Sequence, residues 1–355
     1  MKKKIMVLFL CFTAMALFPL IAVKSTPQSS RLQEQSSLNE NKNSENSNEK
    51  NIVSKQEEEQ NNSKDGQTAS FRILDEDTGQ TITVDDKNFC YGAVAAEMLP
   101  SFDKEALKAQ CIATYTHFCR LREEQRKNPD SDLKGADFSA KLSENQYYMS
   151  DKAMRNTWGE FYNKSFENIK QAVDEVFGEV LTDSDGKLII VAYHAVSGGT
   201  TETYADVFGK EVSYLQAVPS PGDTVAPGYL SECTVSEKDF KAKILVSDNK
   251  VKLSGSADKW IGKFQKTSSG SVKSVKIGNV NFQGTEIRKI FGLRSANFDV
   301  AYSDGNFIFT VRGYGHGVGM SQYGAEYMAQ QGADCKEILS WYYKGTKTEK
   351  YTPKL

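Results

Sequence analysis

The sequence predicts an α+β fold: a mixed core domain with a cleft and a smaller inserted α/β subdomain. Segments with apolar residues three and four apart, typical of helices, occur beside short alternating or continuous apolar segments, typical of strands. The two kinds are mixed without the regular strand–helix–strand alternation of a parallel α/β sheet. We find no repeat of 20–50 residues, which excludes solenoid and propeller architectures.

The first half of the core contains a predicted hairpin and three helices. Residues 71–84 form the hairpin, with Asp-Thr-Gly at its turn. Residues 89–99 are apolar, rich in alanine and followed by a proline, which predicts a short buried helix. Residues 103–126 predict a longer helix capped by Ser101 or Asp103, and 165–177 predict another amphipathic helix. The segment between these last two helices includes an irregular stretch at 134–148.

The second half alternates between short strands and helices. A hairpin is predicted from Leu181 through a Ser-Asp-Gly turn to a strand at 188–193. The remaining predicted elements are a helix near Asp239, strands at 272–280, a helix at 285–291, a strand at 306–312 and two C-terminal helices.

Composition divides the 355 residues into three pieces. Three lysines precede 19 uncharged residues, so residues 1–23 are predicted to be a membrane anchor or signal. We find no good small-x-small cleavage motif and therefore favour an uncleaved single pass, with the remainder on the extracytoplasmic side of the cell membrane. Residues 24–70 lack aromatic residues and are mostly polar, which predicts a disordered linker. Residues 71–355 form the folded domain, in which 231–300 are a possible inserted subdomain.

Charge and cysteine content exclude several classes of protein. With 44 Lys+Arg against 46 Asp+Glu the net charge is −2, which provides no basic field for nucleic acid. The folded piece has five cysteines, an odd number that argues against a complete disulfide framework. Cys111 and Cys119 are about 12 Å apart along one predicted helix, too far to bridge. We expect these thiols to be buried and inert.

Glu97 is the first candidate for chemistry. It is the only charged residue between Lys87 and Asp103, within AAEMLPSFDKEALKAQ at 95–110. Loss of hydration in apolar surroundings raises the pKa of a carboxyl toward the range of a general acid. The alternative is that Glu97 lies on the solvent-exposed face of its short helix.

Two glycine-rich segments are the other candidates. In YHAVSGGTTETYADVFG, residues 193–209, two glycines after a strand allow the backbone to approach a ligand, although they also serve a plain turn. A serine nucleophile is disfavoured there because Ala195 replaces the glycine that a nucleophile elbow needs. In GYGHGVGMSQYGA, residues 313–325, four alternating glycines match neither a phosphate loop nor a dinucleotide fingerprint. His316 in this segment is equally consistent with a structural hydrogen bond and with a proton shuttle.

Together these three segments resemble the stage II sporulation protein D family, which is related to the amidase-enhancer proteins of bacterial cell walls. The resemblance extends over about residues 83–343. GYGHGVGMSQYGA resembles the C-terminal signature of the family, and the other two segments match its other blocks. Three blocks in the same order are more specific than one glycine motif.

The resemblance implies a sporulation enzyme that acts on peptidoglycan during engulfment. It would be a lytic transglycosylase that cleaves the MurNAc–GlcNAc bond of denuded glycan strands and forms 1,6-anhydroMurNAc, with Glu97 as general acid and then base. The substrate-binding positions that carry over are Lys108, Gln110, Tyr115, Tyr193, Ser197, Gly198, Gly199, His316, Gln322 and Tyr323. Tyr115 replaces an arginine usual in the family, so a contact to sugar oxygens would be lost or replaced by stacking. Glu202 and Asp206 are candidates for structural roles.

The resemblance also bears on cofactors and partners. Some relatives carry a cysteine and histidine zinc site that would fall in residues 134–148, which contain neither residue type, so we expect no metal and no cofactor. The expected partners are glycan strands, the membrane, an amidase (stage II sporulation protein P) and a multispanning sporulation membrane protein. The competing interpretation is a non-catalytic module that binds cell-wall glycan and enhances a partner amidase.

Overall fold

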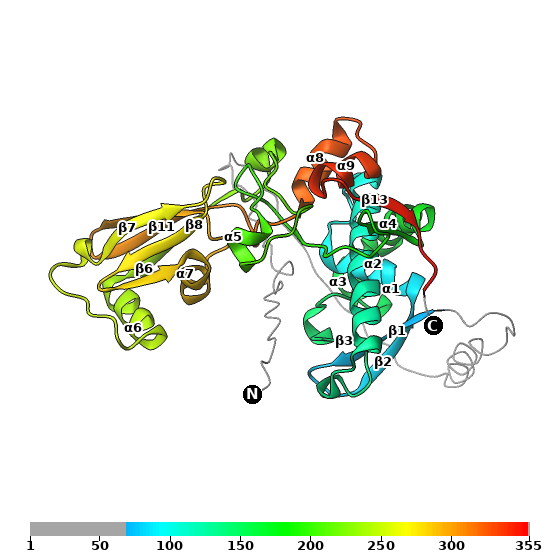
Figure 1. Cartoon of the computed structure of the whole chain (residues 1–355), viewed down its shortest axis with the longest axis horizontal. Helices are drawn as coiled ribbons and strands as arrows, with labels where there is room; N and C mark the ends of the chain where they lie inside the picture. Colours follow the sequence, from blue (N-terminus) through cyan, green and yellow to red (C-terminus); the bar gives the residue numbers. More distant parts are fainter. Residues whose placement is uncertain (1–68, 354–355) are drawn as a thin grey trace, which may run out of the picture. The chain divides into compact units, whose positions relative to one another are not determined.

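The computed structural model describes residues 69–353, and the α+β prediction is confirmed there (Figure 1). The helices are α1 (Asp86–Glu97), α2 (Lys104–Lys127), α3 (Asp151–Trp158), α4 (Tyr162–Val176), α5 (Tyr204–Phe208), α6 (Glu237–Ser247), α7 (Gly284–Phe291), α8 (Gln322–Gln330) and α9 (Cys335–Tyr342). The strands are β1 (Ser70–Asp75), β2 (Thr81–Asp85), β3 (Phe138–Ala140), β4 (Glu179–Thr182), β5 (Tyr193–His194), β6 (Leu230–Ser236), β7 (Ile261–Lys266), β8 (Val272–Ile277), β9 (Val280–Gln283), β10 (Phe298–Ser303), β11 (Asn306–Arg312), β12 (Met320–Ser321) and β13 (Lys347–Lys350).

The predicted N-terminal anchor, residues 1–23, and nearly all of the predicted linker, 24–70, lie outside the described residues. Among the helices at 69–353, none has both the length and the apolar composition that a bilayer crossing requires. The membrane location therefore stays a prediction.

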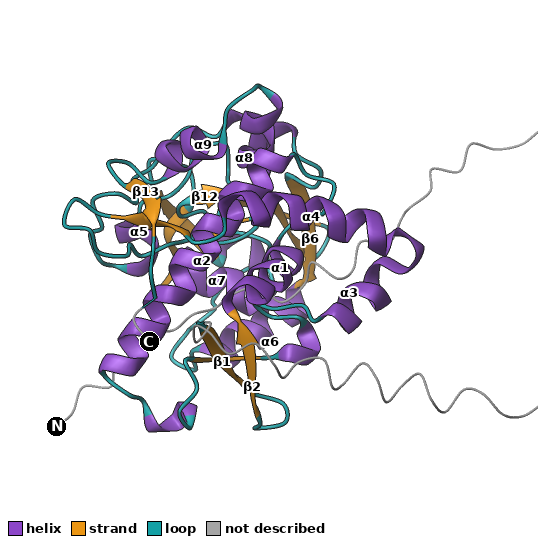
Figure 2. Ribbon diagram, turned by 90° about the vertical axis from the view of Figure 1, so that its right-hand side faces the viewer, coloured by secondary structure: helices purple, strands orange, loops and turns teal. Residues whose placement is uncertain are grey.

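Helix α2 is the centre of the first hydrophobic core. It begins after Asp103, whose carboxylate accepts a hydrogen bond from the backbone N–H of Glu105 at 2.8 Å, as expected of an N-cap. Residues on its successive faces contact α1, α4, α8 and α9. Figure 2 shows these helices together, with the short strands beside them. Because every element that carries a candidate residue of the first and third segments contacts α2, this helix sets their relative positions.

A second hydrophobic cluster lies in residues 235–311. Two three-stranded antiparallel sheets contribute to it, with strand orders β10-β11-β6 and β7-β8-β9, together with α6 and α7. At its centre the rings of Phe240 and Phe307 are stacked with centroids 3.9 Å apart. The inserted subdomain at 231–300 remains a prediction, since a separate cluster does not show that this segment folds by itself.

The predicted strand at 188–193 is wrong for most of its length. Leu188 makes one isolated bridge to Thr182, and regular pairing returns only in β5, Tyr193–His194. Two of the intervening backbone groups bond to tyrosine hydroxyls: the Tyr214 hydroxyl accepts from Ile190 N–H at 2.9 Å. The Tyr343 hydroxyl donates to the Ala192 carbonyl at 2.7 Å. Sequence patterns also missed α3, α5, β3, β6, β7, β10, β12 and β13.

The cysteines within residues 69–353 form no disulfide, and four of the five are buried, as expected. Burial raises the pKa of the Cys335 thiol to about 12 and that of Cys119 further, so both thiols stay protonated and unreactive. Cys233 differs because it is only partly buried.

A buried ion pair connects the first turn of α1 to α2. Arg122 donates two hydrogen bonds to Asp86, at 2.6 and 2.9 Å, and both side chains are almost completely buried. The Tyr115 hydroxyl donates to the same carboxylate at 2.8 Å, and the guanidinium lies 4.2 Å from the centroid of the Phe71 ring. Such bidentate pairs fix orientation as well as distance. The pair therefore fixes the start of the helix that ends at Glu97.

We predict that Arg122→Ala lowers the free energy of unfolding by about 3–5 kcal/mol, because it leaves the Asp86 carboxylate buried and unpaired. Urea unfolding of the full chain, followed by circular dichroism, measures this loss. The matched control is Arg155→Ala, which breaks a pair whose side chains are 59% and 58% exposed and should cost less than about 1 kcal/mol. Equal losses in the two variants would contradict the prediction.

Candidate active site

Glu97 is the last residue of α1 and is 7% exposed. The helix cannot continue far beyond it, because Pro100 follows and disfavours helical geometry in the residue before it. The sequence alternative of a solvent-exposed face is therefore wrong. The carboxyl lies where a helix ends inside the protein.

Two neutral side chains hydrogen-bond the Glu97 carboxyl: Gln322 and Tyr193. Burial raises the pKa of Glu97 to about 7, and the hydrogen bonds from Gln322 and Tyr193 lower it by less than burial raises it. A carboxyl with this pKa is protonated in a large fraction of molecules near neutral pH. It can therefore donate a proton and take one back in the same reaction.

The two partners reach Glu97 through a short parallel ladder. Strand β5 pairs with β12, with Met320 opposite Tyr193 and Ser321 opposite His194. The Ser321 hydroxyl then accepts from Gly324 N–H at 3.1 Å and caps α8, whose first residue is Gln322. The pairing of β5 with β12 therefore positions both Tyr193 and Gln322 beside Glu97.

Gln110 belongs to the same group of residues. The Gln322 side-chain amide donates to Gln110 Oε1 at 3.4 Å, and the Gln110 amide donates to Thr114 Oγ1 at 2.9 Å. Of the predicted site residues, the structure therefore connects Glu97, Gln110, Tyr193 and Gln322 directly, from three segments far apart in the chain.

The backbone conformation of residues 313–319 explains why glycines alternate there. Gly313 and Gly319 have φ of +79° and +70°, a region that favours glycine. A Cβ on Gly313 would lie 2.7 Å from the Val196 carbonyl oxygen, and one on Gly319 would lie 2.0 Å from that of Ala192. The loop that precedes α8 therefore lies directly against the segment that contains Tyr193.

His316 lies in the loop before α8, and its ring makes hydrogen bonds to backbone groups. Its Nδ1 accepts from Val318 N–H at 3.0 Å, and the imidazole also hydrogen-bonds the backbone of Tyr193. Burial lowers the pKa of His316 well below its usual value, so the ring is neutral. Of the two interpretations of this residue, the structural hydrogen bond fits these contacts.

Ser197 and the two glycines after it form a closed turn. The Ser197 N–H donates to Asp223 Oδ2 at 2.8 Å, and its hydroxyl accepts from Gly199 N–H at 3.1 Å. Gly198 has no room for a side chain, because a Cβ there would lie 2.3 Å from the amide nitrogen of Asn297. Ser197 is 1% exposed, so its contacts are internal.

The sequence patterns did not single out Asp223, although they contain a signal for it. It is the only charged residue between Glu211 and Glu232, the same isolation that pointed to Glu97. The side chain is fully buried, and burial raises its pKa.

Lys108 and Tyr115 lie away from the Gln110–Gln322 contact. The Lys108 ammonium pairs with Glu105 at 2.8 Å and with Glu175 at 3.2 Å. Lys108 itself lies about 200° around α2 from Gln110. Tyr115 is 2% exposed, and its hydroxyl is bonded to Asp86 as described above. We therefore leave Tyr115 out of the substrate-binding set, because a sugar cannot stack on a ring inside the core. Lys108 stays a prediction.

Tyr323 is partly exposed and packs edge to face on Phe102, with centroids 5.0 Å apart. Glu202 and Asp206, the candidates for structural roles, both contact the second cluster. The Thr267 hydroxyl donates to Glu202 at 3.1 Å, and Lys273 pairs with Asp206 at 2.9 Å.

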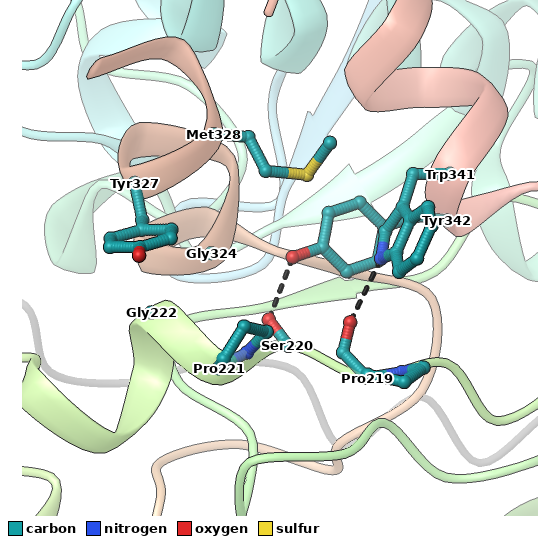
Figure 3. A pocket seen from close by; sticks show the side chains of 9 residues that line it. All are labelled: Pro219, Ser220, Pro221, Gly222, Gly324, Tyr327, Met328, Trp341 and Tyr342. Atoms are coloured by element: carbon teal, nitrogen blue, oxygen red, sulfur yellow. Dashed lines mark hydrogen bonds between the residues drawn. The ribbon is translucent and has the colours of Figure 1, made fainter. Parts of the chain in front are cut away.

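A cavity of about 170 Å³ lies on the other face of α8 (Figure 3). Gly324, Tyr327 and Met328 line it, at positions 140–240° around the helix from Gln322. Two hydrogen bonds close its floor: the Trp341 indole N–H donates to the Pro219 carbonyl at 2.8 Å, and the Ser220 and Tyr342 hydroxyls are 2.7 Å apart. Its lining does not include Glu97, Tyr193 or Gln322, so this cavity is separate from the candidate site.

Within residues 69–353, no three histidine, cysteine or acidic side chains are close enough together to hold a metal ion. The expectation of no metal and no cofactor stays a prediction.

Comparison with known proteins identifies relatives over most of the chain. Residues 75–182 match the family described as Stage II sporulation protein. The chain is similar to stage II sporulation protein D of Bacillus amyloliquefaciens, with 34% identity over 73% of this chain and 72% of the relative. The protein of the same name from Bacillus subtilis is 32% identical over 74% and 73%. The Bacillus subtilis amidase enhancer is 27% identical over 73% of this chain and 40% of its own length.

We predict that the stability of the protein depends on pH through Glu97. Its pKa is about 7 when folded and near 4.5 otherwise, so the folded chain binds this proton more tightly between those values. As pH rises from 4 to 8, the wild type should therefore lose about 3 kcal/mol of unfolding free energy relative to Glu97→Gln.

Urea unfolding of both full-length proteins at several pH values measures this difference. Contributions from every other titrating group are common to the two proteins and cancel. A difference that stays constant from pH 4 to pH 8 would show that the pKa of Glu97 is not raised.

Proposed function

The chain belongs to the stage II sporulation protein D family, and from this premise we propose that it is a peptidoglycan lytic transglycosylase with Glu97 as its general acid and base. The observation that carries the proposal is one buried carboxyl with a pKa of about 7 and two neutral hydrogen-bonding partners. A glycosidase of the usual kind needs two carboxyl groups, one as acid and the other as nucleophile or base. A reaction that closes an internal ring needs only one.

The proposed reaction has two proton transfers. Protonated Glu97 donates its proton to the glycosidic oxygen between MurNAc and GlcNAc as the bond from that oxygen to the anomeric carbon breaks. The carboxylate then takes the proton of the muramoyl 6-hydroxyl, whose oxygen bonds to the anomeric carbon. The products are a 1,6-anhydroMurNAc end and a free GlcNAc hydroxyl, and Glu97 is protonated again.

Tyr193 and Gln322 support both states of the carboxyl. Their hydrogen bonds favour the carboxylate and so limit the rise in pKa that burial causes. Without them the carboxyl would be a weaker acid and would hold its proton too firmly. Tyr193 and Tyr323 are both partly exposed, so their rings are candidates for contact with the sugars of a denuded strand.

The remaining proposals concern where the enzyme acts. Residues 1–23 would anchor it in the cell membrane, with the catalytic domain on the extracytoplasmic side, where peptidoglycan is available during engulfment. An amidase would be a natural partner, because removal of stem peptides produces denuded strands. The similarity to an amidase enhancer supports this pairing. A multispanning sporulation membrane protein is the second partner that we propose.

The same similarity favours a second candidate function, a non-catalytic glycan-binding module that enhances a partner amidase. Glu97 distinguishes the two, since binding alone does not need a carboxyl that exchanges protons near pH 7. A module of this kind would keep its effect on an amidase in Glu97→Gln.

We predict that the wild type converts denuded glycan strands to fragments with 1,6-anhydroMurNAc ends, and that Glu97→Gln lowers this rate by at least about 1,000-fold. The amide keeps the shape of the side chain but cannot transfer the proton. Digestion followed by mass spectrometry of the fragments measures both rates.

The matched control is Glu124→Gln, which alters an acidic residue of α2 whose side chain is 55% exposed and paired with Arg120, and which should retain most activity. Equal yields from wild type and Glu97→Gln would exclude Glu97 as the catalyst. No product from either protein, together with amidase stimulation by both, would favour the enhancer.

A further inference from the structure

Asp223 is a buried charged residue that the proposed reaction does not use. It lies in a short turn at Pro221–Val225 and is fully buried. Its carboxylate accepts hydrogen bonds from two segments that are about 120 residues apart in sequence, one around Ser197 and the other at Ser321. Tyr193, four residues before Ser197, and Gln322, directly after Ser321, hydrogen-bond Glu97.

We propose that Asp223 is a positioning residue, which holds these two segments in the register that lets Tyr193 and Gln322 donate to Glu97. Its effect on catalysis rests on the proposed function, whereas its effect on the hydrogen bonds of Glu97 does not.

The first contact fixes the segment after Tyr193. Ser197 N–H donates to Asp223 Oδ2 at 2.8 Å, and the Ser197 side chain also hydrogen-bonds this carboxylate. Between Tyr193 and Ser197 the chain has an antiparallel bridge from Val196 to Tyr314, so this segment is bonded on both sides. Movement of Ser197 would therefore displace β5.

The second contact fixes the start of α8. The Ser321 hydroxyl lies 2.6 Å from Asp223 Oδ1 and 3.2 Å from the Ala195 carbonyl oxygen. Ser321 is also the N-cap of α8 and the residue before Gln322. The same carboxylate therefore fixes the position at which α8 begins with Gln322.

The ladder between β5 and β12 has only two residue pairs, which is short for a structure that must fix two donors. Asp223 adds a bond to Ser321, which is in β12, and a bond to Ser197, which lies three residues after β5. Every group that the structure shows bonded to this carboxylate is a donor, from Ser197, Ser321 and Ser220. In Asp223→Asn the side-chain NH₂ group, itself a donor, would face donors and could not accept their hydrogen bonds.

The titratable groups around the two carboxyls are few. Tyr342 faces Asp223 through Ser220, with the two hydroxyls 2.7 Å apart, and its own pKa is raised by burial. At Glu97 the bonded groups are Gln322 and Tyr193, of which only tyrosine titrates, far above neutral pH. A change in the titration of Glu97 would therefore report these hydrogen bonds.

The experiment measures the pKa of Glu97 in the full chain labelled with ¹³C at glutamate side-chain carboxyls. The Glu97 resonance is assigned by its loss in Glu97→Gln. In Asp223→Asn we expect the pKa of Glu97 to rise by about one unit, because a weakened donor favours the protonated carboxyl. The rate of glycan cleavage should fall about 10- to 100-fold with little change in KM.

The matched control is Asp137→Asn. Asp137 is 2% exposed and likewise accepts from a backbone N–H, that of Arg72 at 2.9 Å, and from the side chain of Arg126. Its loss should reduce stability without moving the pKa of Glu97. If Asp223→Asn does not fold, Ser321→Ala removes the contact to β12 and should raise this pKa. Ser197→Ala removes only the side-chain bond, keeps the backbone N–H bond to Asp223, and should raise the pKa by less.

An unchanged Glu97 pKa in Asp223→Asn, or an equal rise in Asp137→Asn, would overturn the proposal. Because the pKa is measured without substrate, this test stands even if the protein cleaves no glycan. Absence of cleavage with a shifted pKa would instead refute the proposed function and leave the positioning role intact.

Discussion

Desolvation of the Glu97 carboxyl is the interaction on which the rest of the site depends. A carboxyl at the buried end of α1 loses its water, and that loss alone would keep it protonated well beyond neutral pH. Tyr193 and Gln322 return part of the lost hydrogen bonding, which leaves the pKa near 7. In the proposed reaction, this balance between burial and two neutral donors would allow one residue to act first as an acid and then as a base.

The surrounding architecture brings those two donors to one carboxyl. The buried Asp86–Arg122 pair fixes the start of α1 against α2, and the positive φ of Gly313 and Gly319 lets the loop before α8 lie against the segment of β5. The pairing of β5 with β12 then sets both donors at once. This arrangement depends on a backbone geometry with positive φ in the loop before α8, and the alternating glycines supply that geometry.

Local signals predicted the longer helices well, and non-local contacts account for the failure at 188–193. The helices predicted at 103–126 and 285–291 begin and end within one residue of α2 and α7, because caps and apolar spacing are local properties. The strand at 188–193 was wrong in part because Ile190 N–H and the Ala192 carbonyl bond to the hydroxyls of Tyr214 and Tyr343, which no local pattern shows. The raised pKa of Glu97 followed from its isolation in sequence, whereas the parallel pairing that provides its donors joins residues about 127 apart and could not be predicted.

The measurement that tests the central claim most directly is digestion of denuded glycan strands in water enriched in ¹⁸O, with mass spectrometry of the new ends. If Glu97 activates the muramoyl 6-hydroxyl, the oxygen that attacks the anomeric carbon comes from the substrate itself. The account predicts 1,6-anhydroMurNAc ends that contain no ¹⁸O. Hydrated MurNAc ends that carry ¹⁸O would show that water is the nucleophile and would contradict it.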